Sequence, residues 1–392
     1  MIDLEKRKYV KYILFSSLYF SEGLKWSIAV VIFPLYFDYL GISPTILGLV
    51  IAISGIPTMI KFVFGGIIDY FIKYGRKKFV LFGGLTSSTS LFIIVFINPA
   101  NALIAFTFLF FIGMLGIMFL DVAADAWAIE ITKKKERGKI NGVMFAGISI
   151  GMGVGSILFT QVASNFGYNF VFLFAGLLIL VIIIIPLVIK EVKIIKKIKQ
   201  MKFTLLNEFK NKTVQIFCSF VPFVGIGGGI LLIIIPLYLK NILMLNDAQI
   251  GLIAVIFPIT NIFGSLVGGT LSDRFGRKQT LYIIFSTSLI FATLLIYADT
   301  WQIFAVIYGF IGFLYGSILA SVGALSMDLT NPRLAGTQFS FYMSLFNIGE
   351  VGIGYGLAGF LLDNLGYERV FLYAALFYGL VLLLFYYVKI RK

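Results

Sequence analysis

The sequence has no histidine, a single cysteine, and charged side chains at only 13% of its 392 positions. Without histidine, imidazole acid–base chemistry, zinc–histidine sites and Ser–His–Asp triads are excluded. Cys218 alone permits neither an intrachain disulfide nor a thiolate metal cage. The sequence shows no nucleotide-binding loop and no cluster of metal ligands in their place. We therefore expect no cofactor and no enzymatic activity.

Apolar residues are what the sequence has in excess. They make up 60% of the chain, against about 45–50% in soluble domains, and the mean hydropathy is +1.00. One water-surrounded core cannot hold this excess, so most of the surface must face lipid. A membrane-spanning helix needs about 20 apolar residues, and runs without period-two alternation are helices rather than barrel strands. Twelve such runs are present, at 12–37, 45–68, 79–97, 101–130, 139–163, 168–189, 213–240, 247–272, 279–298, 301–329, 334–360 and 367–388.

The basic residues predict the orientation of these spans. Nearly all of the 32 lysines and arginines lie in the two tails, the central linker and every second loop. The opposite loops hold only Lys240 and Arg369. The positive-inside rule then predicts a multi-pass protein of the cell membrane with both termini in the cytoplasm. A nucleic-acid-binding arm would concentrate its charge instead, so we expect no nucleic-acid partner.

The chain repeats itself after about 200 residues, a period that points to a duplicated architecture. The tripeptide Gly-Arg-Lys at 75–77 recurs at 276–278, and Pro-Leu-Tyr at 34–36 recurs at 236–238. Each copy contains six spans, so the two copies run parallel. The sequence therefore predicts an all-α membrane protein with twelve transmembrane helices in two six-helix bundles, and a site between the bundles near the membrane midplane.

The repeat also divides the chain into domains. Residues 1–189 form the predicted N-terminal bundle, residues 190–212 a basic cytoplasmic linker, and residues 213–392 the C-terminal bundle. The linker is rich in lysine, which favours contact with the anionic cytoplasmic leaflet. The alternative is a connector that is merely solvated.

A glycine pair, an acid and then Gly-Arg-Lys stand between spans 2 and 3 and again between spans 8 and 9. This pattern resembles the signature loop of the major facilitator superfamily, so the resemblance implies the major facilitator fold. An acid at a helix end followed by a glycine turn and basic residues can form an ion-pair latch that holds one conformation. Static surface pairs are the alternative. The expected latch residues are Asp69, Arg76, Lys77 and Glu130 in the first half, and Asp273, Arg277 and Asp328 in the second.

Two segments of the first half resemble one branch of that superfamily. Residues 20–24, Phe-Ser-Glu-Gly-Leu, are similar to its Phe-Ser-x-Gly-Leu opening, and residues 121–127, Asp-Val-Ala-Ala-Asp-Ala-Trp, resemble its Asp-Ile-x-x-Asp-Ala/Gly-Tyr/Trp stretch. The branch is that of the AmpG-type muropeptide permeases and the related acetyl-CoA transporters. The second half resembles only the superfamily as a whole. Span 5 lacks the Gly-Pro pair typical of drug/proton antiporters, which disfavours efflux.

Charged residues inside the spans are candidates for the site, since each costs roughly 2.5–3.5 kcal/mol to insert. Glu22 and Lys25 are three residues apart, so we expect them to share a helix face and to pair. Asp121 and Asp125 are four apart and would repel unless they share a proton or a basic partner, for which Lys61 is the candidate. The resemblance implies that spans 1, 4, 7 and 10 line a central cavity. Trp127 is a candidate for stacking on a ligand, and Glu350 is the one deep acid of the second half.

These residues predict a secondary active transporter. We expect it to import a polar, anionic small solute by alternating access together with protons, and to work as a monomer in membrane lipid. The charged candidates could instead be buried pairs that orient helices. The amide of Asn347 could either bind substrate or form a hydrogen bond between helices. Efflux, uniport, and a non-transporting membrane sensor or assembly factor are the alternative functions. The candidate site residues are Glu22, Lys25, Lys61, Asp121, Asp125, Trp127 and Glu350.

Overall fold

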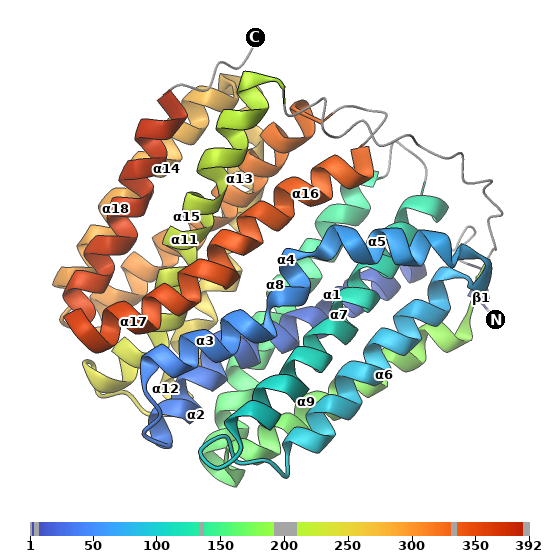
Figure 1. Cartoon of the computed structure of the whole chain (residues 1–392), viewed down its shortest axis with the longest axis horizontal. Coiled ribbons are helices and arrows are strands. Elements are labelled where there is room, and N and C mark those ends of the chain that lie inside the picture. Colours follow the sequence, from blue (N-terminus) through green and yellow to red (C-terminus); the bar gives the residue numbers. More distant parts are fainter. Residues whose placement is uncertain (1, 4–7, 133–136, 192–209, 331–334, 387–392) are drawn as a thin grey trace.

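The computed structural model describes residues 2–3, 8–132, 137–191, 210–330 and 335–386, and they are almost entirely helical. Figure 1 shows the two halves of the chain as two helical bundles side by side. The first half contains β1 (Ile2–Asp3), α1 (Lys8–Ser27), η1 (Ile28–Ile32), α2 (Phe33–Tyr39), α3 (Pro44–Ser54), α4 (Ile56–Met59), α5 (Lys61–Tyr70), η2 (Ile72–Tyr74), α6 (Arg76–Ile94), α7 (Leu103–Ile131), α8 (Arg137–Phe166), α9 (Tyr168–Ile184), η4 (Ile185–Val188) and β2 (Ile189–Lys190). The second half contains α11 (Lys212–Asn241), α12 (Asp247–Ala254), α13 (Ile256–Phe275), α14 (Arg277–Leu294), η5 (Leu295–Tyr297), α15 (Trp301–Asp328), α16 (Ala335–Asn347), η7 (Ile348–Gly354), α17 (Tyr355–Leu365) and α18 (Tyr367–Tyr386).

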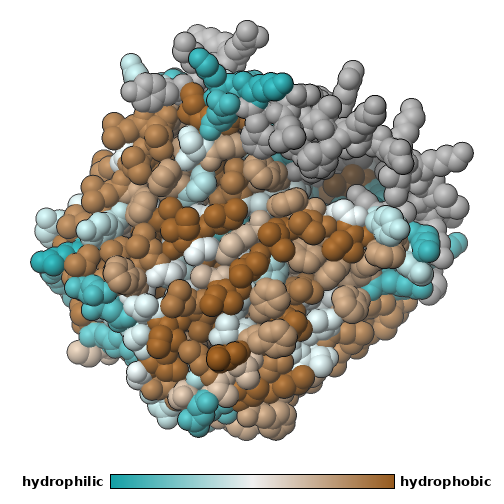
Figure 2. Space-filling view, in the orientation of Figure 1, coloured by the Kyte–Doolittle hydropathy of each residue, from teal (hydrophilic) through white to brown (hydrophobic). Residues whose placement is uncertain are grey.

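The predicted twelve-helix fold is confirmed. Ten helical runs among the described residues are long and apolar enough to cross a membrane. The other two predicted spans are helical as well: the second is split into α3, α4 and α5, and the third is α6. Helix α6 begins with three basic residues and carries the hydroxyl run Thr-Ser-Ser-Thr-Ser at 86–90, which lowers its hydropathy. Figure 2 shows apolar side chains over the middle of the visible face and polar ones mostly at its ends, as expected for a surface in lipid.

Glycines let helices within a bundle approach each other at backbone distance. In the first bundle α8 lies against α1, and a Cβ on Gly147 or Gly151 would collide with the carbonyl oxygens of Ser16 and Phe20. In the second bundle a Cβ on Gly225 would collide with the carbonyl oxygen of Phe346. Small residues serve this purpose in membranes, where helices associate through close packing rather than through the hydrophobic effect.

The second span, 45–68, is helical but interrupted near Pro57. Helix α3 ends at Ser54 and Gly55 follows it. The single turn α4 comes next, and Ile60 leaves helical geometry at φ −112° and ψ 25° before α5 begins. Two local causes act together. Pro57 has no backbone N–H to donate, and the space beside Gly55 is filled by Val351 of the other bundle. The second half repeats the interruption between α12 and α13, at Val255 and three residues before Pro258.

The two bundles touch through α3 against α17 and through α8 against α12 and α13. Figure 1 shows α3 and α17 running alongside each other, away from the end of the molecule at which β1 lies. Gly48 and Gly359 make the first contact possible, because a Cβ on either would overlap the backbone of Tyr355 or Pro44. The bundles are therefore in backbone contact near the end opposite the signature loops.

Several expectations concern residues outside the described part of the chain. Most of the predicted linker, 190–212, is among them, and so is the side chain of Asp69. At the linker's start, β2 pairs in parallel with β1, with Ile2 opposite Ile189 and Asp3 opposite Lys190. The domain boundaries and the orientation of the termini remain predictions.

Candidate functional site

The center of the candidate site is an ionic cluster around Lys61. Its Nζ lies 2.5 Å from Asp121 Oδ2 and 3.6 Å from Asp125 Oδ2. Lys61 is the first residue of α5, directly after the break at Ile60, so the interruption of the second span sets where this side chain starts. Asp121 and Asp125 are one turn apart on α7. The basic partner that two neighbouring carboxylates require is thus present.

Helix α1 adds two side chains to the cluster. The Tyr19 hydroxyl donates a hydrogen bond to Asp125 Oδ1. Glu22 Oε1 accepts a hydrogen bond of 3.3 Å from Trp26 Nε1, while its Oε2 is buried with no hydrogen-bond partner among the described residues. Glu22 interacts electrostatically with both Asp121 and Lys61. Three helices, α1, α5 and α7, therefore meet at one group of charges.

The charges of this cluster do not balance. The three carboxylates of Glu22, Asp121 and Asp125 face the single ammonium group of Lys61. A surplus of negative charge in the membrane is costly unless it is compensated, and a proton or another cation can supply the missing positive charge. The exposed fractions are 27% for Lys61 and 35% for Asp125, against 1% for Asp121. Lys61 and Asp125 are thus the partly exposed members of the cluster, whereas Asp121 is enclosed.

The expected pair between Glu22 and Lys25 is not formed. Lys25 is fully buried, and its Nζ lies 4.2 Å from the center of the Phe110 ring with no hydrogen-bond partner among the described residues. A Cβ on Gly113 would collide with this ammonium, so the glycine makes room for it. Three residues of α-helix leave two side chains about 60° apart, and here that angle sends Lys25 towards α7 and away from Glu22.

Two other candidates lie apart from the cluster. Trp127 is 1% exposed and packs edge-on against Phe15 at 5.7 Å, so it is a packing residue of the first bundle in this conformation. Glu350 lies in the π-helical segment η7 of the second bundle and accepts a hydrogen bond from the Tyr315 hydroxyl. No cation lies within ion-pair distance of Glu350 among the described residues.

The expected latch pairs are present in both halves. Arg76 Nη2 lies 2.9 Å from Glu130 Oε1, and both side chains are largely buried. Arg277 bridges Asp273 Oδ1 at 2.5 Å and Asp328 Oδ2 at 2.9 Å, in more exposed surroundings. Their role in conformational change stays a prediction.

Lys77, the second basic latch candidate of the first half, has other partners. Its Nζ donates to the carbonyl oxygens of Leu187 and Ile189, at 3.1 and 3.0 Å. Glu191 accepts the backbone N–H groups of Arg76 and Lys77 at the start of α6, a favourable place for a carboxylate. The signature loop is thereby joined to the segment that leads into the linker.

Polar bridges join the two bundles at the end opposite the signature loops. The sequence analysis did not predict them. Asn241 Nδ2 donates to Asp38 Oδ1 at 2.9 Å, and Tyr168 OH donates to Asp247 Oδ2 at 2.5 Å. The backbone N–H and the hydroxyl of Thr45 both donate to Asp363 Oδ2, at 2.8 and 2.5 Å. The available signal was the presence of these acids in loops that contain almost no basic residues.

Comparison with curated proteins finds relatives of low identity. The chain is 27% identical over 151 residues to the quinolone resistance protein NorA of Staphylococcus aureus, a match that covers 38% of this chain and only 37% of NorA. It is 24% identical over 402 aligned residues to multidrug resistance protein 2 of Bacillus subtilis, covering 94% of this chain and 93% of that protein.

Solved structures resemble the chain over almost its whole length. The nucleoside transporter NupG has a TM-score of 0.79 at 16% identity, covering 97% of this chain and 100% of that one. A bacterial homologue of the human lysosomal transporter Spinster, in an inward-facing and occupied conformation, has a TM-score of 0.77 at 13% identity, covering 97% and 95%. The D-xylose–proton symporter has a TM-score of 0.73 at 14% identity, covering 97% and 96%. At these identities the likeness shows the fold alone.

The family model described as Major Facilitator Superfamily matches residues 15–224 and 216–392. The two stretches divide the chain close to the predicted repeat. Because the matches together cover nearly the whole sequence, the chain belongs to the Major Facilitator Superfamily.

Proposed function

We propose that this transporter, which is not an enzyme, moves a polar small solute by alternating access, with a proton as the coupling ion. The observation that carries the proposal is the unbalanced cluster, in which three carboxylates share one lysine at the junction of α1, α5 and α7. A group of charges that becomes neutral only after taking up a cation gives the protein a reason to couple protonation to movement. We further propose that it acts as a monomer.

The contacts between the bundles support alternating access. The bundles are joined by polar bridges and glycine contacts at the end opposite the signature loops. Such an arrangement closes one end while the other is free to open. By the positive-inside rule the basic end, with both termini, faces the cytoplasm. On this proposal the structure corresponds to a state closed towards the outside.

The charge of the cluster bears on the solute. An anionic solute was expected because Lys25 and Lys61 could attract it. Lys61 is already between two carboxylates, and Lys25 is buried against Phe110 within the first bundle. This arrangement favours a neutral or cationic polar solute, or one that brings a hydrogen-bond donor to Asp125. The AmpG-type resemblance keeps sugar-peptides among the candidates.

Import is the proposed direction, and efflux is the second candidate. Import follows from the AmpG-type resemblance and from the lack of a Gly-Pro pair in span 5. Efflux is favoured by the names of the relatives, which are resistance proteins, and by the negative cluster, which suits cationic drugs. The two directions differ in which sign of pH gradient drives accumulation of the solute.

The test begins with a ligand screen on the purified protein. Melting temperature is measured with sugar-peptides, nucleosides, organic cations and organic anions, since a ligand that binds the folded state raises it. The compound that binds is then followed in proteoliposomes with an imposed pH gradient. The proposal expects gradient-driven movement in the wild type and its loss in Asp121→Asn/Asp125→Asn.

Two results would contradict the proposal. Full gradient dependence in the double variant would remove the cluster as the proton site. Absence of any transported compound, together with an unchanged cellular phenotype of the double variant, would favour a non-transporting sensor or assembly factor. The variant Glu350→Gln is a matched control, because it neutralises a buried carboxylate outside the cluster.

A further inference from the structure

The break near the middle of the second span leaves a backbone carbonyl that needs a donor. In a continuous helix the carbonyl of Thr58 would accept the N–H of Phe62. Ile60 has left helical geometry between them, and Val63 N–H bonds to the Ile60 carbonyl at 2.9 Å. A carbonyl in hydrocarbon surroundings must be satisfied by another protein group.

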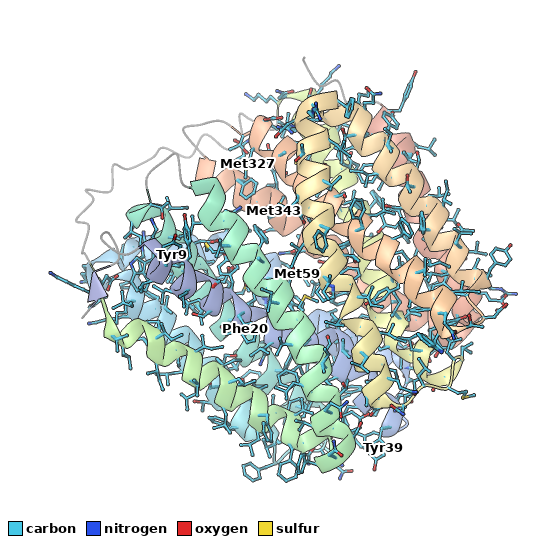
Figure 3. All side chains as sticks on the ribbon, turned by 180° about the vertical axis from the view of Figure 1, so that it is seen from behind. Tyr9, Phe20, Tyr39, Met59, Met327 and Met343 are labelled. Carbon is cyan, nitrogen blue, oxygen red and sulfur yellow. The ribbon has the colours of Figure 1, made fainter. Side chains whose placement is uncertain are left out.

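The donor comes from the other bundle. Asn347, the last residue of α16, donates from Nδ2 to Thr58 O at 3.1 Å. Neighbouring contacts place the same two segments together: Val351 fills the space beside Gly55, and a Cβ on Gly352 would lie 3.0 Å from Met59 Cε. Figure 3 labels Met59 where the two bundles meet.

The same break leads directly to the ionic cluster. Lys61 follows Ile60, so the residue whose geometry is irregular lies between the carbonyl held by Asn347 and the ammonium held by Asp121 and Asp125. One side of the break is therefore tied to the second bundle, and the other side is tied to the charges of the first.

We propose that Asn347 is a positioning residue that transmits the charge state of the Lys61 cluster to the contact between the bundles. The inference rests on the proposed function and deepens it. Thr58 O has two alternative donors. With the bundles together it binds the Asn347 amide, and Lys61 reaches Asp121. When the bundles separate, the carbonyl takes the N–H of Phe62, the helix becomes continuous, and Lys61 is withdrawn from Asp121.

An amide is required for this role. Leucine at 347 would leave the carbonyl without its donor. Ionised aspartate has acceptor oxygens only and would face another acceptor, so this variant is informative at about pH 8. Glutamine keeps the donating amide on a longer side chain. The series Asn347→Leu, Asn347→Asp and Asn347→Gln thus separates the donor from size and polarity.

The test measures how pH changes the separation of the bundles. Spin labels are attached through Tyr39→Cys and Met244→Cys, two exposed positions at the end opposite the signature loops, in a Cys218→Ser background. Distance distributions are recorded in nanodiscs at about pH 5.5 and about pH 8. In the wild type we expect the ratio of separated to closed molecules to change about tenfold, within the usual range of coupling between two sites.

Titratable side chains surround the break on four elements, and each could contribute to a pH response. Helix α1 contributes Tyr19 and Glu22, α5 contributes Lys61, and α7 contributes Asp121 and Asp125. The η7 segment that packs against the break contributes Glu350, which is held by Tyr315. Glu350→Gln is therefore measured in parallel, and loss of the pH response in this variant would assign the response to Glu350 and overturn the role of the Lys61 cluster.

Asn347→Leu and Asn347→Asp are expected to lose most of the pH response, and Asn347→Gln to retain it at least in part. Asn261→Leu, which removes another half-buried amide within a span of the same bundle, should behave as the wild type. Adding Lys61→Met to Asn347→Leu should not reduce the pH response further, since residues acting in one chain of contacts are non-additive.

Each outcome decides something. A wild-type pH response that persists in folded Asn347→Leu overturns the role of Asn347 and leaves the proposed function standing. A wild type without any pH response overturns proton coupling, and the inference falls with it. Melting temperatures of all variants identify any that merely fail to fold, and for these the comparison of Asn347→Asp with Asn347→Gln carries the test.

Discussion

The two bundles share a fold and differ in their buried charges. Both have glycine contacts between helices, an interrupted span, and an arginine latch at the signature loop. The first bundle holds Lys25 and the cluster around Lys61, whereas the second holds Glu350, bound to a tyrosine. The two copies therefore share the features that pack their helices, whereas the ion pairs inside the spans lie in the first copy.

Within the first bundle, the two lysines of the spans also differ. Lys61 has two carboxylates within ion-pair distance, and Lys25 has an aromatic ring. A buried charge with matched partners is costly to unpair, whereas one without them is costly to keep. Sequence position alone does not distinguish the two. Substituting them tests the comparison most directly.

The largest effect is expected for Lys61→Met. It removes the one cation from a site of three carboxylates, and breaking a buried pair costs about 3 kcal/mol or more. We expect a clear loss of melting temperature at neutral pH and loss of gradient-driven transport. Adding Asp121→Asn should recover part of the stability, because it removes one uncompensated charge. An unchanged melting temperature in Lys61→Met would show that the cluster is not held together by this lysine.

The next effect compares the two latches. Arg76 and Glu130 are 6% and 9% exposed, whereas Arg277, Asp273 and Asp328 are 20%, 71% and 50% exposed. Arg76→Ala should therefore destabilise by about 2–3 kcal/mol and Arg277→Ala by about 1 kcal/mol or less, since exposed pairs contribute little. Denaturation in detergent at low and high salt checks this. Equal losses would mean that burial does not distinguish the two latches.

An effect of opposite sign is expected for Lys25→Met. Methionine has a similar length and no charge, so it can fill the space beside Phe110 and Gly113 without an unpartnered ammonium. We expect the stability to stay the same or to rise by about 1–2 kcal/mol, with transport retained. A large loss of transport in a stable Lys25→Met protein would instead show that Lys25 takes part in transport.

The smallest effect is expected for Glu350→Gln. The amide oxygen can still accept the hydrogen bond from Tyr315, and no ion pair is lost. The change in stability should be within about 1 kcal/mol, the usual size of one hydrogen bond, and gradient-driven transport should remain. If this variant abolished coupling as Asp121→Asn/Asp125→Asn is expected to do, the asymmetry between the bundles would not be functional.

The sequence was sufficient for the arrangement of the helices. Run length predicted the spans, because hydrocarbon thickness sets the number of residues that a helix needs to cross it. The partnership of Lys61 with Asp121 and Asp125 was also accessible, since two carboxylates one turn apart require a cation. Asp38 and Asp363, by contrast, find their cross-bundle partners 203 and 318 positions away along the chain. No local pattern reports such a contact.

The pairing of Glu22 with Lys25 failed for a different reason. Helical spacing defines a shared face only to within tens of degrees, and the neighbouring helix then decides where each side chain turns. Gly113 leaves an opening for Lys25 beside Phe110, and Trp26 holds Glu22. A proline within the second span indicates an interruption of the helix. Its place at Ile60 depends on the other bundle as well, because Val351 fills the space beside Gly55 and Asn347 donates to the carbonyl of Thr58.

Composition, periodic apolar runs and the internal repeat by themselves determined a duplicated helical transporter in lipid, because these properties depend on the solvent and on spacing along the chain. The tertiary structure alone decided which charges are paired, which side chains contact the interruption of the second span, and which residues join the bundles. These contacts depend on the distance between atoms that are far apart in the sequence. Helix packing sets that distance only after both bundles have formed.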